Sequence, residues 1–284
     1  MIPALGSVRS DERHLFLGQL EVPGVQDARF EFNNGMSSIS ALGLIAPRFA
    51  PRGLQAGTIS VSAMLISDDV FLSFTGASGI NAYLIGNDKS SLSPNFSASE
   101  CYLTSYSARY AVGEVPQIEC TFSVYGNMAQ FAPNHFPQEF QRDISYLKTG
   151  FSNLELKIPG PGTISVNASG IESNRLQSYE IRLECQREPL FEPGNRMPYR
   201  VELVHPITAR CSFRFDLADM IPQSLKDSPP GQIFDLNIGI SGIYPYRGIA
   251  NYSFSSLQHV SQSIDTNVNG SQSLILEYVG QVAV

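Results

Sequence analysis

The chain has 284 residues, of which 43% are hydrophobic and 16% charged, so it can bury the core of one large domain or of two ordinary ones. Its formal net charge of −7 argues against a protein that grips nucleic-acid phosphates, because that affinity comes from Lys and Arg. It has no window of about 18 apolar residues and no basic-then-apolar signal at its start, so neither a membrane span nor secretion is expected.

The N-terminal part is expected to form an arm, a strand and a long loop. Residues 1–19 are predicted to be an arm that docks by its apolar end, or else a frayed terminus, and residues 20–32 alternate as a strand does. Long structureless loops in compact domains are usually functional, and an exposed apolar loop costs solubility unless something covers it. The loop at residues 33–57 is therefore expected to reach onto another subunit, or alternatively to fold back on its own sheet. Its apolar side chains are Ile39, Leu42, Leu44, Ile45 and Phe49.

The middle of the first half is predicted to be a strand, a short helix and an amphipathic hairpin. Residues 58–66 alternate, Asp68 and Asp69 are placed to cap a helix over 70–74, and the hairpin spans 101–127 with a turn at 112–116. Its second arm has one apolar face, which consists of Ile118, Cys120, Phe122 and Val124. In its first arm, two sets of side chains are expected to lie on opposite faces of the strand. One set is Tyr102, Thr104, Tyr106, Ala108 and Tyr110, and the other is Cys101, Leu103, Ser105, Ser107 and Arg109. Such a hairpin needs further strands or a partner chain.

A linker at 131–150, with a helix over 138–147, is predicted to lead into a second copy of the same pattern. Asp27 aligns with Ser178 at an offset of 151 (27 to 178), and Val61 aligns with Cys211 at 150 (61 to 211). The hairpin aligns with 251–280, its first arm at an offset of 151 and its second at 154, so the second turn is expected to be three residues longer. Residues 186–204 take the place of the long loop as a shorter one, and 218–223 that of the short helix. Matching regions in one order predict an internal duplication.

The string YLTSYSARYAVGEVPQIECTFSVYG and the segment Pro23-Gly24-Val25-Gln26-Asp27 resemble the central hairpin and the first strand entry of tail-tube proteins of long-tailed bacteriophages. The resemblance covers residues 20–130. It implies a mainly β chain of two tandem antiparallel β-sandwich or half-barrel domains, each with a short flanking helix. The expected divisions are an N-terminal arm at 1–19, a first tail-tube domain at 20–130, the linker at 131–150 and a second tail-tube domain at 151–284.

Six tube domains form one ring in that family, so two domains per chain imply a homotrimeric, pseudo-hexameric ring. Closing strands into a ring removes sheet edges that would otherwise invite pairing with other chains. Rings that stack head to tail through residues 33–57 would build a hollow conduit for genome delivery. Such a tube would belong to the virion tail, would be assembled in the host cytoplasm, and would contact other tail proteins at its two ends.

Phage DNA would pass through the bore without specific binding, because a wall with few Lys or Arg removes the attraction that comes from counterion release. The polar hairpin faces are the candidates for the bore, with an ordinary solvated strand face as the alternative. The candidate residues are Ser105, Ser107, Glu119, Thr121 and Ser123 in the first half and Ser253, Ser255 and Glu277 in the second.

Residues that could carry chemistry are scattered. The cysteines, which are Cys101, Cys120, Cys185 and Cys211, are widely spaced, so buried reduced thiols are expected. The four His residues are isolated, so no metal or cofactor is expected. No G-x-S-x-G, H-E-x-x-H, P-loop or G-x-G-x-x-G motif occurs, so an enzyme is not expected. Alternatives to the tube are a distal-tail or terminator ring protein of the same tail, and a glycan-binding β-sandwich, against which the absence of Trp counts.

Overall fold

The protein has a mainly β fold built from large antiparallel sheets, as the two-residue alternation predicted. The computed structural model describes residues 13–33, 36–39, 48–51, 56–65, 69–76, 78–86, 95–112, 114–131, 161–168, 171–173, 176–216, 233–242, 250–266 and 272–282. Within these ranges the only helix is a single 3-10 turn, η2 (Phe71–Phe74).

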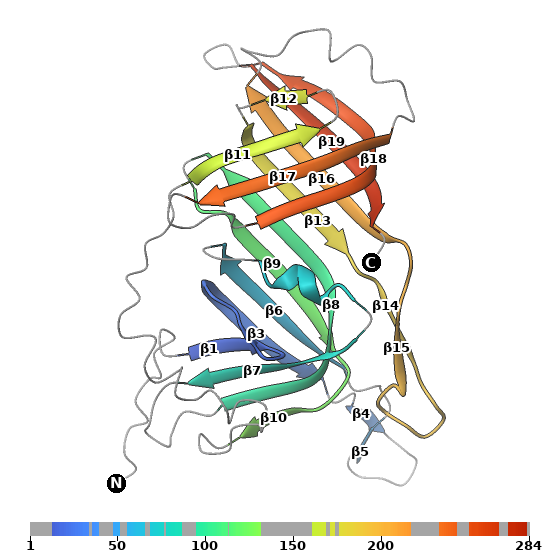
Figure 1. Cartoon of the computed structure of the whole chain (residues 1–284). Helices are drawn as coiled ribbons and strands as arrows, with labels where there is room; N and C mark the ends of the chain where they lie inside the picture. The colour runs from blue at the N-terminus through green and yellow to red at the C-terminus, as the bar shows by residue number, and fades with distance from the viewer. Residues whose placement is uncertain are drawn as a thin grey trace.

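A first group of strands forms two sheets that share one long strand, β8. The strands are β1 (Arg13–Leu17), β2 (Leu20–Glu21), β3 (Val25–Asn33), β4 (Met36–Ile39), β5 (Arg48–Pro51), β6 (Ala56–Met64), β7 (Ile80–Gly86), β8 (Asn95–Ala111), β9 (Gln117–Val124) and β10 (Met128–Phe131). The first part of β8 pairs with β7 and β10, and its second part pairs with β9. The strand order is β2-β1-β7-β8-β9-β6-β3, with the β4–β5 hairpin as a separate small sheet (Figure 1).

A second group of strands repeats this arrangement. Its strands are β11 (Pro161–Ala168), β12 (Ile171–Ser173), β13 (Leu176–Glu184), β14 (Arg187–Leu190), β15 (Arg200–Leu203), β16 (Ile207–Asp216), β17 (Ile233–Gly242), β18 (Ala250–Asp265) and β19 (Ser273–Val282). The long strand is now β18, which pairs first with β17 and then with β19. The order is β12-β11-β17-β18-β19-β16-β13, with the β14–β15 hairpin separate.

The two groups also share the positions of their β-bulges. A bulge lies just before Asp27 in β3 and just before Ser178 in β13, at an offset of 151 residues (27 to 178). Another lies just before Ser105 in β8 and just before Ser261 in β18, at an offset of 156 (105 to 261). Because a bulge is a specific local insertion and not a general property of sheets, these matches set the correspondence between the groups more tightly than alternation does.

The strand register corrects the predicted correspondence of two strand regions. β6 and β16 match at an offset of 152 (63 to 215) and not 150, and both arms of the hairpin match at 156 (109 to 265 and 117 to 273). A shift of two residues, as in β6 (150 to 152) and in the second arm of the hairpin (154 to 156), leaves every side chain on its face, so alternation could not detect it. The first arm shifts by five residues (151 to 156), and the bulges before Ser105 and Ser261 break the alternation on which its alignment depended. The second turn is not longer, since seven residues separate Arg109 from Gln117 and seven separate Asp265 from Ser273.

The segment predicted to be a long loop contains strands wherever the structure describes it. β3 continues to Asn33, β6 begins at Ala56, and the β4–β5 hairpin lies between them. The β14–β15 hairpin takes the corresponding place in the second group, and both inserts have 22 residues (34–55 and 185–206), so the second is not shorter. The short helix is η2, where Asp69 Oδ1 accepts a hydrogen bond of 2.9 Å from the Phe71 N–H. The segments 132–150 and 218–223, with the expected second helices, lie outside the described residues.

One continuous core joins the two groups. β8 pairs on its far side with β13, from Ser105 opposite Glu184 to Ala111 opposite Ser178, which gives an eight-stranded order β3-β6-β9-β8-β13-β16-β19-β18. A single hydrophobic cluster extends from Leu15 and Leu17 of β1 to Tyr278 of β19, so the apolar end of the expected arm is part of the core.

The burial of the central hairpin confirms one arm and corrects the other. In β9 the predicted apolar face is buried throughout. In β8 the bulge breaks the alternation: Cys101, Tyr102 and Leu103 are all buried, and only from Ser105 onward do the residues alternate as predicted. An inserted residue turns the side chains that follow it to the opposite face.

Candidate functional site

The eight-stranded sheet has one polar, solvent-accessible face, which we call the polar face. It consists of the side chains that alternate with the buried ones on these strands. Six of the predicted bore residues lie on it, either exposed or half-buried: Ser105, Ser107, Glu119, Thr121, Ser123 and Glu277. The register sets Glu119 opposite Ser107 and Thr121 opposite Ser105, so the fold brings the first-half candidates together.

The remaining two candidates are not brought to the same place. Ser253 and Ser255 lie in the first part of β18, which pairs with β17, and Ser253 is opposite Asn237 there. At the offset of 156, the counterparts of Ser105 and Ser107 are Ser261 and Ser263, and both are exposed beside β19. Comparison of the two halves of the sequence did not identify them, because β18 is rich in serine along its whole length and several registers give the same polar–apolar alternation.

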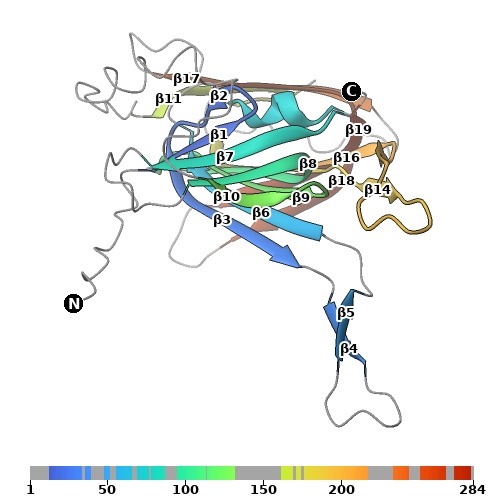
Figure 2. The ribbon, with the colours of Figure 1, turned by 90° about the horizontal axis from the view of Figure 1, so that it is seen from below.

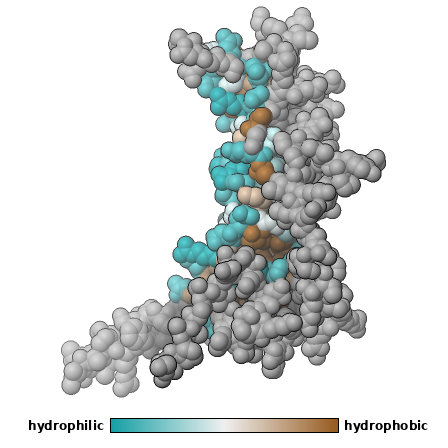
Figure 3. Space-filling model, turned by 90° about the vertical axis from the view of Figure 1, so that its left-hand side faces the viewer, coloured by the Kyte–Doolittle hydropathy of each residue, from teal (hydrophilic) through white to brown (hydrophobic). Residues whose placement is uncertain are grey.

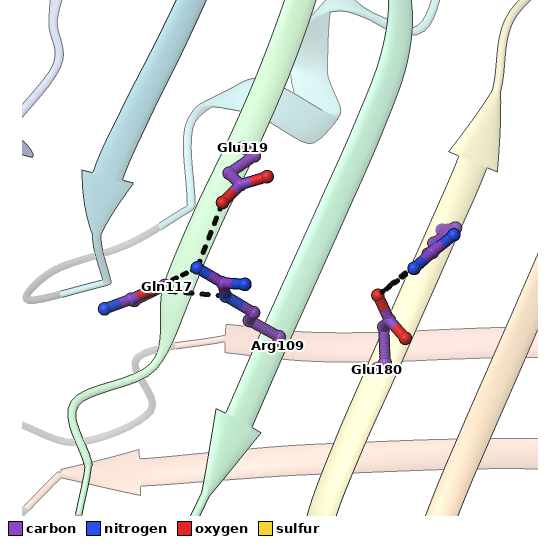
Figure 4. Close-up of polar contacts among 5 residues, drawn as sticks. Arg109, Gln117, Glu119 and Glu180 are labelled. Carbon is purple, nitrogen blue, oxygen red and sulfur yellow. Dashed lines mark hydrogen bonds and ion pairs between the residues drawn. The ribbon is translucent and has the colours of Figure 1, made fainter. Parts of the chain in front are cut away.

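The charges of the polar face are largely paired with one another. Arg109 Nη2 lies 3.1 Å from Glu119 Oε1 and donates a hydrogen bond of 2.8 Å to Gln117 Oε1 (Figure 4). Arg182 Nη2 donates at 2.6 Å to Glu180 Oε1, and Arg214 and Asp265 pair at 3.2 Å. Arg29 pairs with Glu31.

Lysine is absent from all eight strands of this sheet, which carry five arginines. Four of the five, all but Arg210, make the ion pairs given above. Arg210 lines a hollow of about 320 Å³ on the polar face together with Glu180 and Glu277. A polyanion that crosses this face therefore meets arginines set among carboxylates and no basic patch.

The eight-stranded sheet ends in two edges that have no strand partner among the described residues. One is residues 27–32 of β3, which pair with β6 on their other side, and we call it the β3 edge. The other is residues 259–265 of β18, which pair with β19 on their other side, and we call it the β18 edge. Three of the large apolar side chains that the described surface exposes lie on these edges: Phe32 (37% exposed), Val260 (61%) and Ile264 (54%).

The two small hairpins are placed differently. β4–β5 stands away from the sheets (Figure 2), with Ile39 opposite Arg48 and Phe49 opposite Ser38 in its backbone register. Leu42, Leu44 and Ile45 lie outside the described residues. The other hairpin, β14–β15, is held against the first group by Arg187.

Arg187 is buried, and its guanidinium spans the two groups. Its Nε donates to the Leu103 carbonyl at 3.1 Å, and its Nη2 donates to the carbonyls of Thr75 (3.1 Å) and Gly76 (2.8 Å). The Cζ lies 5.7 Å from the centre of the Tyr102 ring, within the range of a cation–π contact. Burial lowers the pKa of Arg187. The hydrogen bonds that its guanidinium donates to three carbonyls stabilise the charged form.

The four cysteines are free and buried, as predicted. Burial raises the pKa of Cys101 and of Cys211 to about 12 and raises that of Cys120 and Cys185, so these thiols are poor nucleophiles at neutral pH. The described residues contain no group of three or more His, Cys, Asp or Glu side chains that could hold a metal ion. No helix in the described part of the chain is long and apolar enough to cross a membrane.

The side of the molecule shown in Figure 3 is mainly hydrophilic over its described surface, with separate hydrophobic patches among the hydrophilic residues. No protein-family model matches the chain, and no curated protein matches it.

Proposed function

We propose that this protein is the structural subunit of a phage tail tube, in which trimeric, pseudo-hexameric rings stack into a hollow conduit for genome delivery. The observation that carries the proposal is the repeat: two groups of strands with one order, matching bulges and matching hairpins, joined edge to edge into an open sheet. The repeat supports an internal duplication into two tail-tube domains.

An open sheet of repeated units favours closure by further copies. Each unit contributes four strands to the eight-stranded sheet, and the unit-to-unit junction β8–β13 can recur at the two edges. Closed barrels remove the edges that otherwise promote uncontrolled association. The resemblance to tail-tube proteins sets the ring at six units, which is three chains with three times eight strands.

The polar face suits the wall of a conduit. DNA binding is driven by release of counterions when Lys and Arg neutralise phosphates, and here the sheet has no lysine and most of its arginines are paired with carboxylates. Such a wall does not attract the phosphate backbone, so DNA can pass along it without binding. The role is that of a passive channel, with no catalytic step.

The β4–β5 hairpin is suited to contacts between rings. It leaves the sheet between β3 and β6 and stands apart from the rest of the molecule (Figure 2). Its position supports the role expected for residues 33–57, which is to reach onto the next ring of the stack.

Electron microscopy of the purified protein at increasing concentration tests the proposal. The expected result is annular particles with three-fold symmetry and approximate six-fold symmetry, and tubes at higher concentration. Rings that never stack would point to a distal-tail or terminator ring of the same tail. A particle that stays a monomer at all concentrations, or one that binds a glycan array, would contradict a tube role.

A further inference from the structure

The β8–β13 junction inside the chain is a template for a second junction between chains. β8 corresponds to β18, and β13 corresponds to β3, by the bulge positions. β18 and β3 are therefore the counterparts of the two strands that form the internal junction, and each presents an edge that has no strand partner among the described residues. A structure built from repeats can satisfy both edges at once if β18 of one copy pairs with β3 of the next.

The internal register fixes which residues would meet. Across the internal junction Arg109 is opposite Glu180, and Ala108 is opposite Ile181. Offsets of 156 on the β8 side and 151 on the β13 side convert these pairs into Asp265 opposite Arg29 (109 to 265, 29 to 180) and Ile264 opposite Phe30 (108 to 264, 30 to 181).

We propose that the β18 edge pairs antiparallel with the β3 edge of a second copy of this chain, with Asp265 opposite Arg29 and Ile264 opposite Phe30. The proposal rests on the proposed tube function and adds the partner, the surface and the register. It makes the contact heterologous, so successive copies form a ring when the rotation closes and a helical filament when it does not.

Charge complementarity supports this register. The internal junction sets the cation Arg109 on the β8 side against the anion Glu180 on the β13 side. At the corresponding positions of the two edges, each charge has the opposite sign. The anion Asp265 stands on the β18 edge in place of the cation Arg109, and the cation Arg29 stands on the β3 edge in place of the anion Glu180. The exchange keeps opposite charges face to face, which stabilises a cross-strand pair.

The same exchange disfavours a wrong partner. If the β3 edge met β8 of another copy, Arg29 would lie opposite Arg109, and if the β18 edge met β13, Asp265 would lie opposite Glu180. Like charges directly opposite one another are destabilising. The two junctions are thus distinguished from each other although their backbones are equivalent.

The apolar side of the edges also matches. Ile181 and Ala108 are buried where they meet in the internal junction, with exposed fractions of 0% and 1%. Their counterparts are Phe30, which is partly buried against the core, and Ile264, which is 54% exposed. Pairing between copies would remove Ile264 from water, which accounts for a large apolar side chain at an edge.

A disulfide scan tests the register in assembled protein. Arg29→Cys combined with Asp265→Cys places two cysteines on exposed positions directly opposite each other, and mild oxidation is expected to give covalent dimers and trimers on non-reducing gels. Arg29→Cys with Ser263→Cys is the matched control, shifted by two residues, where a disulfide cannot form without backbone movement. The native cysteines are buried and do not compete.

Charge reversal tests the pairing without a cross-link. Arg29→Glu alone and Asp265→Arg alone are expected to raise the protein concentration needed for half-maximal ring formation roughly tenfold, because each places like charges at every junction. The double variant is expected to recover at least half of that loss. The circular dichroism spectrum of each single variant shows whether it still folds.

The outcomes separate this inference from the tube function. Rings that cross-link only in the shifted control, or a double variant no better than the singles, would overturn the register and leave the tube role standing. Wild-type protein that never assembles would overturn both. Cross-linking of the first pair together with rescue by the double variant supports both.

Discussion

Arg187 anchors the β14–β15 hairpin to the first group of strands. Its guanidinium serves three backbone carbonyls of the first group while its own strand, β14, belongs to the second. At the offset of 151 its counterpart in the first hairpin is Met36 (36 to 187), so the β4–β5 hairpin lacks this anchor.

Arg187→Met is therefore expected to lower the free energy of unfolding by about 2–3 kcal/mol, because one buried carbonyl and two part-buried ones lose a charged donor. Urea unfolding followed by circular dichroism measures the change. Arg200→Met is the control, since Arg200 lies in the same hairpin with its side chain 68% exposed and is expected to shift stability by no more than about 0.5 kcal/mol. Equal effects of the two variants would show that Arg187 is not an anchor.

Buried thiols and a buried phenol make stability depend on alkaline pH. The pKa is raised by burial to about 12 for Cys101, Cys211 and Tyr278, from usual values of 9.0 for the thiols and 10.0 for the phenol. A raised pKa means that the folded state holds its proton longer than the unfolded state does, so the stabilisation is complete below the unfolded pKa and is lost as pH rises.

The urea midpoint is thus expected to be flat up to about pH 9, as far as these groups are concerned, and to fall between pH 9 and 12. A Cys101→Ala/Cys211→Ala variant is expected to lose stability less steeply over that interval. A midpoint of the wild-type protein that stays constant from pH 9 to 11 would contradict the burial of these groups.

At the scale of elements, the turn after β9 depends on a close approach between two backbones. Gly126 donates its N–H to the Ser99 carbonyl at 3.2 Å, and the Asn127 N–H donates to Ser99 Oγ at 3.0 Å. A Cβ on Gly126 would lie 2.5 Å from the Ser99 carbonyl oxygen. Only glycine lets the chain leave β9 this close to β8.

Gly126→Ala is expected to destabilise the protein by about 1–3 kcal/mol, because the backbone must move to relieve the overlap. Thermal unfolding reports the loss. Gly76→Ala serves as the control, as a Cβ there would meet no atom within 4 Å. A Gly126→Ala protein as stable as the Gly76→Ala protein would show that the turn relaxes freely.

The β4–β5 hairpin allows a test of ring stacking. Deletion of residues 40–51 alone would remove β5 and leave β4 without its strand partner, so we choose replacement of residues 36–51 by a short Gly-Ser turn. The expected result is folded rings that no longer form tubes in electron micrographs. Long tubes from this variant would show that the hairpin does not link rings.

At the scale of the whole molecule, the polar face is predicted to be inert toward DNA. Wild-type tubes are expected not to bind short duplex DNA at low salt, whereas a Glu119→Lys/Glu277→Lys variant is expected to bind it with an affinity that falls as salt rises. Fluorescence anisotropy measures both. Glu188→Lys/Glu202→Lys, on the β14–β15 hairpin, makes the same change in net charge away from the polar face.

Equal binding by both double variants would mean that net charge, and not the polar face, controls contact with DNA. Binding by the first variant alone would support the placement of Glu119 and Glu277 at the bore. This comparison is informative because the two variants have the same sequence pI shift and differ only in where the lysines lie.

The sequence by itself determined that the chain is mainly β, and it identified the buried face of β9 and of the second part of β8. Alternation identified the buried face of β9 and the polar side chains opposite it, because successive residues of a strand point to opposite faces and the polarity of each residue can be read from the sequence. The sequence also predicted strands at residues 20–32 and 58–66, where the structure has β3 and β6, and a short helix over 70–74, where it has η2, since these depend on neighbours a few residues away.

The tertiary structure alone decided the partners of the strands and the exact correspondence between the two groups of strands. A period of two is unchanged when a strand slides by two residues, as β6 does between the offsets of 150 and 152. In the first arm of the hairpin, whose offset changes from 151 to 156, a bulge breaks the alternation. The offsets of 152 and 156 became visible only through the strand pairing and the bulges before Asp27, Ser105, Ser178 and Ser261. The β8–β13 junction joins strands that are far apart in the chain, and no local pattern encodes such a choice. The two edges follow from that junction, because they are the strand sides that it leaves without a described partner.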